Sequence, residues 1–342
     1  MPDPTPPDTP AKSRFYHHPL AFLATWRSFP AYELLSYFFM YSGTVMFAYG
    51  IRTYTTQTYL LLILSVATMY AGFFAALIWN DITDKDIDAV VHPDRPIPRQ
   101  RISPRRFFAI ALLFSALTFL FAILISPWCL ILVGGAALFV AVHDKYLKKR
   151  VKFPAYSEIF TPVQWLVVPL FGFFAVWSAL PHCVDFSITA PLLGTLSIER
   201  ADLLPMALLV LFTYFADDAH DIAEGILDCD GDRRIGVRTY ATSFGPRVAA
   251  AVSFAMFVLA GILGILLYLY SILSLIFLLP FLALWAYTLF FSFRLLQAKD
   301  PQQQKDLGRL VGRKGYNLLL FSYVLLFLDV LIQLLLSYPR SC

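Results

Sequence analysis

Long apolar stretches separated by short polar segments run along this chain from Ala31 almost to its end. Nine of them are long enough, or nearly so, to cross a bilayer as helices, which takes about 20 residues. They are residues 31–50, 58–79, 106–125, 128–143, 159–180, 203–217, 248–270, 272–293 and 316–337. The fourth and sixth stretches are short, and we expect their helices to be longer. The pattern predicts an all-α, polytopic membrane protein with nine transmembrane helices.

The composition agrees with this class. Of the 342 residues, 58% are hydrophobic and only 15% are charged, which excludes an ordinary soluble domain. Five prolines fall within the first 12 residues, so we expect residues 1–27 to form a disordered or amphipathic tail and residues 28–342 a single membrane domain. The four cysteines lack metal-ligand or redox spacing, so ordinary thiols are expected. Membrane lipid is the expected environment, and no nucleic-acid partner is expected.

Lysine and arginine are distributed unevenly between alternate connecting segments. Of the 27, only Arg52, Arg200 and Arg340 fall on one side of the predicted membrane. The other 24 lie in the N-terminal tail and near the segments after the second, fourth, sixth and eighth stretches. Because basic residues favour the cytosolic side, the N-terminus is predicted to be cytosolic and the C-terminus to lie opposite. An even number of spans would destroy this alternation.

An acidic group follows the second stretch, on the predicted cytosolic side. Residues 80–88 read Asn-Asp-Ile-Thr-Asp-Lys-Asp-Ile-Asp. If the helix continues past Trp79, Asn80, Asp84 and Asp88 share one face, and like charges on one face repel unless a cation neutralises them. A single carboxylate here would be an ordinary solvated helix cap, but four at a membrane boundary favour a site. Because hard oxygen ligands suit Mg²⁺, the candidate metal ligands are Asn80, Asp81, Asp84 and Asp88.

A second acidic group begins where the sixth stretch ends, in a segment, residues 217–239, that we expect to be a loop after this span. Its acids are spaced four, three, four and four residues apart, and are Asp217, Asp221, Glu224, Asp228 and Asp232. On a continuous helix they would form one stripe, which Gly225 and Gly231 could interrupt. A calcium-binding loop starting at Asp228 is a weak alternative, because it requires glycine and glutamate where Arg233 and Thr239 stand.

Basic residues lie between the two acidic groups, in residues 145–152. Their ordinary role is to anchor the protein on the cytosolic side. A diphosphate that bridges two metal sites also needs Lys or Arg donors. The candidates for that role are Arg95, Lys149, Arg150 and Arg238.

These features together suit the binding of an amphiphile. They are acidic groups at the ends of two predicted helices, basic segments nearby and an apolar interior in a chain with 32 Phe. Its head would be a diphosphate at the membrane interface, and its lipid-like tail would lie between helices. Divalent cations and basic donors stabilise the charge on a leaving diphosphate, so the expected reaction is ionisation of an allylic isoprenoid diphosphate. The resulting cation needs shelter from water and benefits from aromatic faces.

Two motifs resemble the signatures of the UbiA superfamily of intramembrane prenyltransferases, which includes UbiA-type terpene cyclases. Asn80-Asp81-x-x-Asp84-x-x-x-Asp88 with the following Arg95-Pro96-Ile97-Pro98 resembles the first signature. Asp228-x-x-x-Asp232-x-x-x-Gly236-x-x-Thr239 resembles the second. The nine stretches also match, so the resemblance covers nearly the whole chain. It implies a helical bundle around a central cavity that opens sideways to lipid, with Mg²⁺ bound by both motifs.

The resemblance also implies residue roles. The residues expected to take part in catalysis are Asp84, Asp88, Asp228, Asp232 and Tyr146, and the metal ligands of the second motif are Asp228 and Asp232. Where this motif usually begins with Asp, three residues before Asp228, the chain has Gly225, so Asp221 and Glu224 are candidate additional ligands. Tyr146 is close to, but displaced from, the tyrosine position expected before Lys149. The segment Trp26–Pro30 lacks the acceptor-binding pattern of members that use aromatic substrates.

Three functions remain open at this point. The first is transfer of a prenyl group to an acceptor, either aromatic or lipid. The second is cyclisation of farnesyl or geranylgeranyl diphosphate to a terpene. The third is transport, which predicts ionisable groups in mid-membrane; Asp329 is the main one within the apolar stretches.

Overall fold

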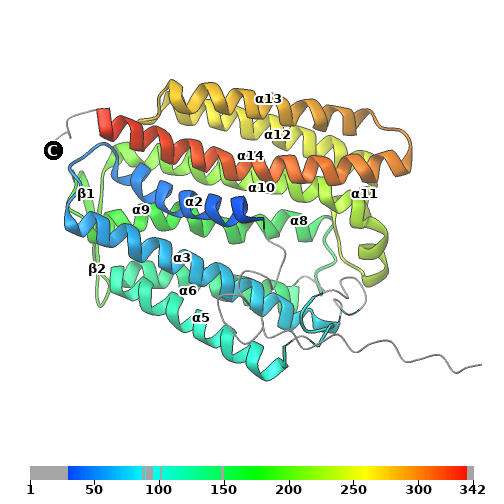
Figure 1. Cartoon of the computed structure of the whole chain (residues 1–342), viewed down its shortest axis with the longest axis horizontal. Helices are drawn as coiled ribbons and strands as arrows, with labels where there is room; N and C mark the ends of the chain where they lie inside the picture. The colour runs from blue at the N-terminus through cyan, green and yellow to red at the C-terminus, as the bar shows by residue number, and fades with distance from the viewer. Residues whose placement is uncertain (1–29, 87–88, 90–94, 101, 148–149, 337–342) are drawn as a thin grey trace, which may run out of the picture.

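The computed structural model describes residues 30–86, 89, 95–100, 102–147 and 150–336. Long antiparallel helices make up nearly all of this part (Figure 1). They are α2 (Ala31–Tyr49), α3 (Thr56–Thr83), α5 (Pro104–Ile125), α6 (Pro127–Val142), α9 (Val167–Ala179), α10 (Arg200–Ile235), α12 (Pro246–Leu269), α13 (Leu275–Gln297) and α14 (Pro301–Leu336). The prediction of an all-α bundle is confirmed, while the tail boundary at residue 27 lies outside the described residues.

Eight helical segments in the described part are long and apolar enough to cross a membrane. They correspond to the second to ninth predicted stretches, so the polytopic class is confirmed. Helix α2 occupies the first predicted stretch but is not among the eight, so the count of nine spans stays a prediction. The fourth and sixth helices are longer than their apolar stretches, as expected: α6 continues into a π-helix, η2 (His143–Leu147), and α10 has 36 residues.

Short elements connect the long helices. The fifth span is composite, because α8 (Tyr156–Phe160) and the 3₁₀ helix η3 (Thr161–Leu166) precede α9. The long segment between the fifth and sixth spans holds an antiparallel pair of strands, β1 (Phe186–Ala190) and β2 (Gly194–Ile198). Helix α11 (Tyr240–Phe244) follows α10. Cys183 is disulfide-bonded, so the expectation of ordinary thiols is wrong there, whereas Cys129 and Cys229 are free and buried.

Glycines bring α14 close to α10. Gly308, Gly312 and Gly315 recur at intervals of four and three residues, so they lie on one face of α14. A Cβ at Gly308 would lie 2.7 Å from the backbone oxygen of Ala223, and one at Gly315 would lie 2.8 Å from Cβ of His220. Small residues allow such close approach between membrane helices. The row therefore fixes α14 against the acidic part of α10.

Asp329 of α14 is completely buried, and its hydrogen-bond partners explain why a carboxylate is tolerated there. Its Oδ2 accepts a hydrogen bond from the backbone N–H of Ser274 at 2.6 Å, and its Oδ1 accepts one from the Ser274 hydroxyl at 2.7 Å. Gln333 donates a third at 2.9 Å. Asp329 thus satisfies the start of α13, where backbone N–H groups lack partners within the helix. This structural role removes the main argument for transport.

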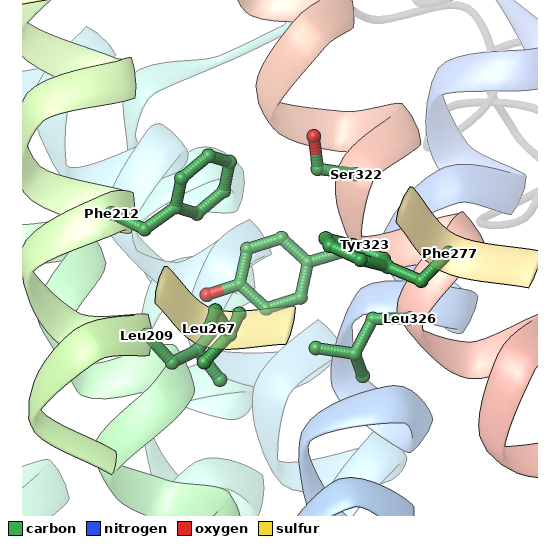
Figure 2. A pocket seen from close by; sticks show the side chains of 7 residues that line it. All are labelled: Leu209, Phe212, Leu267, Phe277, Ser322, Tyr323 and Leu326. Atoms are coloured by element: carbon green, nitrogen blue, oxygen red, sulfur yellow. The ribbon is translucent and has the colours of Figure 1, made fainter. Parts of the chain in front are cut away.

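A small apolar gap lies between α10, α12, α13 and α14 (Figure 2). The side chains around it are Leu209, Phe212, Leu267, Phe277, Ser322, Tyr323 and Leu326. The gap is too small for a water molecule, and Phe212 is about 24 Å along α10 from Asp228, at 1.5 Å per residue. This gap is not the central cavity that the sequence predicts beneath the acidic motifs, and that cavity stays a prediction.

Candidate active site

Both acidic motifs lie at the same end of the bundle. Helices α3 and α10 run in the same direction and their C-terminal ends, together with α8 and α11, lie at the right of the view (Figure 1). Residues about 140 positions apart in the sequence are therefore brought to one face of the membrane domain.

The first motif begins within α3 and extends past its end. Helix α3 ends at Thr83, and Asp84 caps it, with its backbone N–H donating to the oxygen of Asn80 at 2.9 Å. The regular helix therefore stops before Asp84, whose N–H still makes the helical bond to Asn80, and the interpretation of Asn80, Asp84 and Asp88 as one helical face stays a prediction. Asp88 lies outside the described residues.

Two predicted site residues of this motif contact each other. Asp81 is only 1% exposed, and Nη1 of Arg95 lies 3.3 Å from its Oδ1. A buried carboxylate needs such a partner, because an unpaired buried charge is costly. The pair fixes the turn that starts at Arg95 against the end of α3.

The acidic residues of the second motif lie in a helix, which corrects the expected loop for residues 217–235. Helix α10 passes Gly225 and Gly231 without interruption and ends at Ile235, after which Gly236 adopts φ 78°. The five acids from Asp217 to Asp232 therefore lie on one continuous helix, within about 80° of each other at 100° per residue. Asp228 is exposed and Asp232 half-buried.

His220 lies between acids of this stripe. Its Nε2 is 3.0 Å from Oδ1 of Asp217, and its Nδ1 is 3.4 Å from Oδ1 of Asp221. One ligand atom from each of His220, Asp221 and Glu224 can be chosen so that all lie within 4.8 Å of one another. The structure thus brings together both candidate additional ligands, Asp221 and Glu224, with a histidine that was not among the predicted site residues. Its spacing from Asp217, three residues, was the available signal.

Two buried carboxylates were also missing from the predicted site. Asp218 is 1% exposed, and neither of its carboxylate oxygens has a hydrogen-bond partner among the described residues. Glu158, in α8, is 5% exposed, and its Oε2 accepts a hydrogen bond from the backbone N–H of Tyr240. A lone acid at the start of an apolar stretch was the only sequence signal for Glu158.

In the basic segment, the described residues Lys145, Arg150 and Lys152 are exposed. Tyr146 lies in η2, with Nζ of Lys145 5.3 Å and Cζ of Arg150 5.7 Å from its ring centroid. These distances fit cation–π contacts. Lys149 lies outside the described residues. Arg238 has an exposed side chain, while its backbone oxygen accepts a hydrogen bond from Ser157 at 3.0 Å, which joins the segment after α10 to α8.

Tyr240 begins α11 beside the buried acids. Burial raises the pKa of its phenol, and the carboxylates of Asp218 and Glu158 raise this pKa further, because a second negative charge there is unfavourable. The phenol therefore stays protonated at neutral pH and remains a hydrogen-bond donor.

The oxygen donors fit a divalent cation such as Mg²⁺. Several carboxylates share one helix face, and Asp218 and Glu158 present buried oxygens without partners in the described part of the chain. Hard anionic oxygens are the ligands that Mg²⁺ prefers, and a bound cation would relieve their repulsion.

These features define a polytopic, all-α membrane protein with a carboxylate-rich site where its helices end on one side. The chain belongs to the UbiA prenyltransferase family, which matches residues 38–312. The resemblance inferred from the two motifs is therefore confirmed.

Relatives and solved structures agree with this assignment. A digeranylgeranylglyceryl phosphate synthase from Natronomonas pharaonis is 31% identical over 188 residues, 54% of this chain and 57% of that protein, so the match spans less than two thirds of the relative. The apo structure of a UbiA homolog from Aeropyrum pernix K1 has a TM-score of 0.61 at 21% identity, covering 88% of this chain and 97% of that one. A UbiA homolog from Archaeoglobus fulgidus bound to GPP and Mg²⁺ has a TM-score of 0.51 at 17% identity, covering 84% and 96%. At these identities the two structures show the fold.

Proposed function

We propose that this protein is a Mg²⁺-dependent membrane prenyltransferase. It ionises an allylic isoprenoid diphosphate, releases diphosphate and transfers the prenyl group to an acceptor. The observation that carries this proposal is the position of two acidic motifs at the same end of an apolar helical bundle. An amphiphilic substrate matches this arrangement, because its charged head can bind at the acidic end and its isoprenoid tail can lie among the apolar helices.

Residues of both motifs are proposed to bind the metal ion and the diphosphate. Those proposed to hold Mg²⁺ are Asn80, Asp81, Asp84, Asp88, Asp228 and Asp232, with Asp221 and Glu224 as additional ligands. Bound Mg²⁺ supplies positive charge that stabilises the leaving diphosphate. The proposed diphosphate donors are Arg95, Lys149, Arg150 and Arg238, because guanidinium and ammonium groups donate to phosphate oxygens.

Aromatic side chains inside the bundle suit an allylic cation. The ring of Tyr37 in α2 lies 4.6 Å from that of Phe73 in α3 and 6.1 Å from that of Trp165 in η3, measured between centroids. Tyr41 and Tyr70 extend the group, with centroids 5.2 Å apart. Aromatic faces stabilise cations, and a dry interior protects them from water.

The acceptor is proposed to be lipid-like rather than aromatic. The relative from Natronomonas pharaonis is named for a product in which geranylgeranyl groups are joined to glyceryl phosphate. A polar lipid head would reach the same membrane interface as the acidic motifs. Intramolecular cyclisation is the second candidate, favoured by the aromatic group around Tyr37.

An assay with purified protein distinguishes these reactions. With geranylgeranyl diphosphate and Mg²⁺, we expect diphosphate release to be slow without acceptor and to rise at least tenfold when a glycerol-phosphate lipid is added. Removing Mg²⁺ with EDTA should abolish release, because the leaving group then lacks its counter-charge. Rapid release without acceptor, together with a hydrocarbon product, would instead identify a cyclase.

We also propose that the acidic end faces the cytosol. The distribution of basic residues supports this orientation, and so does the disulfide at Cys183, which lies on the proposed opposite side, where disulfides persist. In sealed inside-out bacterial membrane vesicles, Lys299→Cys should react with an impermeant maleimide without permeabilisation. Lys299 is exposed and close in sequence to Lys305, whose ammonium contacts Asp230 of α10. Labelling only in right-side-out vesicles would contradict the orientation.

A further inference from the structure

We propose that Glu158 is an additional metal ligand, which supplies from α8 the carboxylate that α10 lacks at Gly225. The inference rests on the proposed function, since it concerns the same cation site. It differs from the motif assignment, because Glu158 belongs to neither acidic motif.

Gly225 makes room for Glu158. A Cβ at Gly225 would overlap Oε1 of Glu158, so any other residue there would displace this carboxylate. Glycine within a helix is unfavourable relative to alanine, yet α10 continues through this position without a break. The space that the Glu158 carboxylate needs explains why a glycine stands at this position of the helix.

The position of Gly225 borders the acidic stripe. It is four residues after Asp221 and three before Asp228, so a group that occupies its surface lies between theirs on the helix. The carboxylate of Glu158 also interacts electrostatically with those of Asp218, Asp221 and Asp232. Glu158 thus enters the stripe at the point where α10 itself has no side chain.

The two oxygens of Glu158 have different surroundings. Oε2 accepts the hydrogen bond from the Tyr240 N–H, whereas Oε1 is buried and has no partner among the described residues. A buried carboxyl group next to other carboxylates either holds a proton or is balanced by a positive charge. A divalent cation held jointly with the acids of α10 provides that charge.

Local hydrogen bonds hold Glu158 in place. The backbone N–H of Ala155, which has φ 55°, donates to the Ser243 hydroxyl at 3.1 Å, and that of Ser157 donates to the Arg238 oxygen at 3.0 Å. Together with the Tyr240 contact, these bonds attach the start of α8 to the segment after α10. The carboxylate is therefore preorganised, as a ligand position requires.

The experiment measures Mn²⁺ binding to the full-length, detergent-solubilised protein by electron paramagnetic resonance, with inorganic diphosphate present. Glu158→Gln keeps the size of the side chain and an oxygen that can accept from Tyr240, but removes the charge. We expect its Mn²⁺ affinity to fall at least tenfold, with the thermal midpoint unchanged. The exposed acid Asp230, which contacts Lys305 at 2.6 Å, provides the control: Asp230→Asn should bind like wild type.

A second variant tests the position rather than the residue. In Glu158→Ala/Gly225→Asp the carboxylate moves to α10, and we expect Mn²⁺ affinity to return to within about threefold of wild type, whereas Glu158→Ala alone stays weak. Wild-type affinity in Glu158→Gln would mean that Glu158 only caps Tyr240, and would overturn this inference alone. Absence of Mn²⁺ binding in the wild type would overturn the proposed function with it.

Discussion

Replacing Asp84 or Asp228 by alanine should lower the rate of diphosphate release by about 100- to 1,000-fold, the effect expected when charge stabilisation of a leaving group is removed. Asp84 caps α3, and Asp228 is exposed on the acidic face of α10, so the two residues represent the two motifs. Because neither side chain is in the hydrophobic core, both variants should fold. The measurement is diphosphate release from geranylgeranyl diphosphate at saturating Mg²⁺, with thermal stability recorded in parallel.

Asp230 supplies the matched control for Asp228. It lies two residues further along α10 and is also exposed, but its carboxylate contacts Lys305 of α14. Asp230→Ala should keep activity within about threefold of wild type, since an exposed ion pair contributes little. Near-wild-type activity in both Asp84→Ala and Asp228→Ala would refute the metal assignment of the two motifs.

Replacing Gly308 by leucine should both destabilise the protein and inactivate it. A Cβ at this position would lie 2.7 Å from the backbone oxygen of Ala223 and 3.4 Å from Cβ of Ile226. Backbone cannot rotate out of the way, so α14 must move from α10, at a cost of about 1–3 kcal/mol or more. The displaced part of α10 carries Glu224 and Gly225. We expect a thermal midpoint several degrees lower and an activity loss of at least tenfold.

Gly135 provides the comparison. It lies in α6, is exposed, and has nothing within 4 Å of a Cβ built on it. Gly135→Leu adds the same side chain to a helix without a close neighbour, so stability should be unchanged or slightly raised. Equal thermal midpoints for Gly308→Leu and wild type would show that close α10–α14 packing is not required.

The sequence determined the class of this protein and the parts of its chemistry that are local. Apolar length predicted the eight helices that are long and apolar enough to cross a membrane, because backbone groups in lipid must be satisfied within a helix. The spacing of Asp217, Asp221 and Asp228 indicated one stripe if the segment were helical, although a loop was expected there, and the motifs predicted the family. These features depend only on residues near one another in the chain, so they can be predicted from the spacing of residues along the sequence.

Tertiary structure decided the rest. The helix at the first motif ends at Thr83, and Asp81 pairs with Arg95 rather than standing alone. Asp329 proves to be a helix cap. Glu158 reaches the acidic stripe from a helix more than 60 residues away in sequence, at a glycine that looked like a defect in the motif. Contacts between distant segments cannot be predicted from the spacing of residues along the sequence, because they depend on how whole helices pack. The spacing along the sequence therefore indicated which acids of α10 share one helix face. Only the packing of α8 and α14 against α10 could bring Glu158 to Gly225 and Gly308 to the backbone of Ala223.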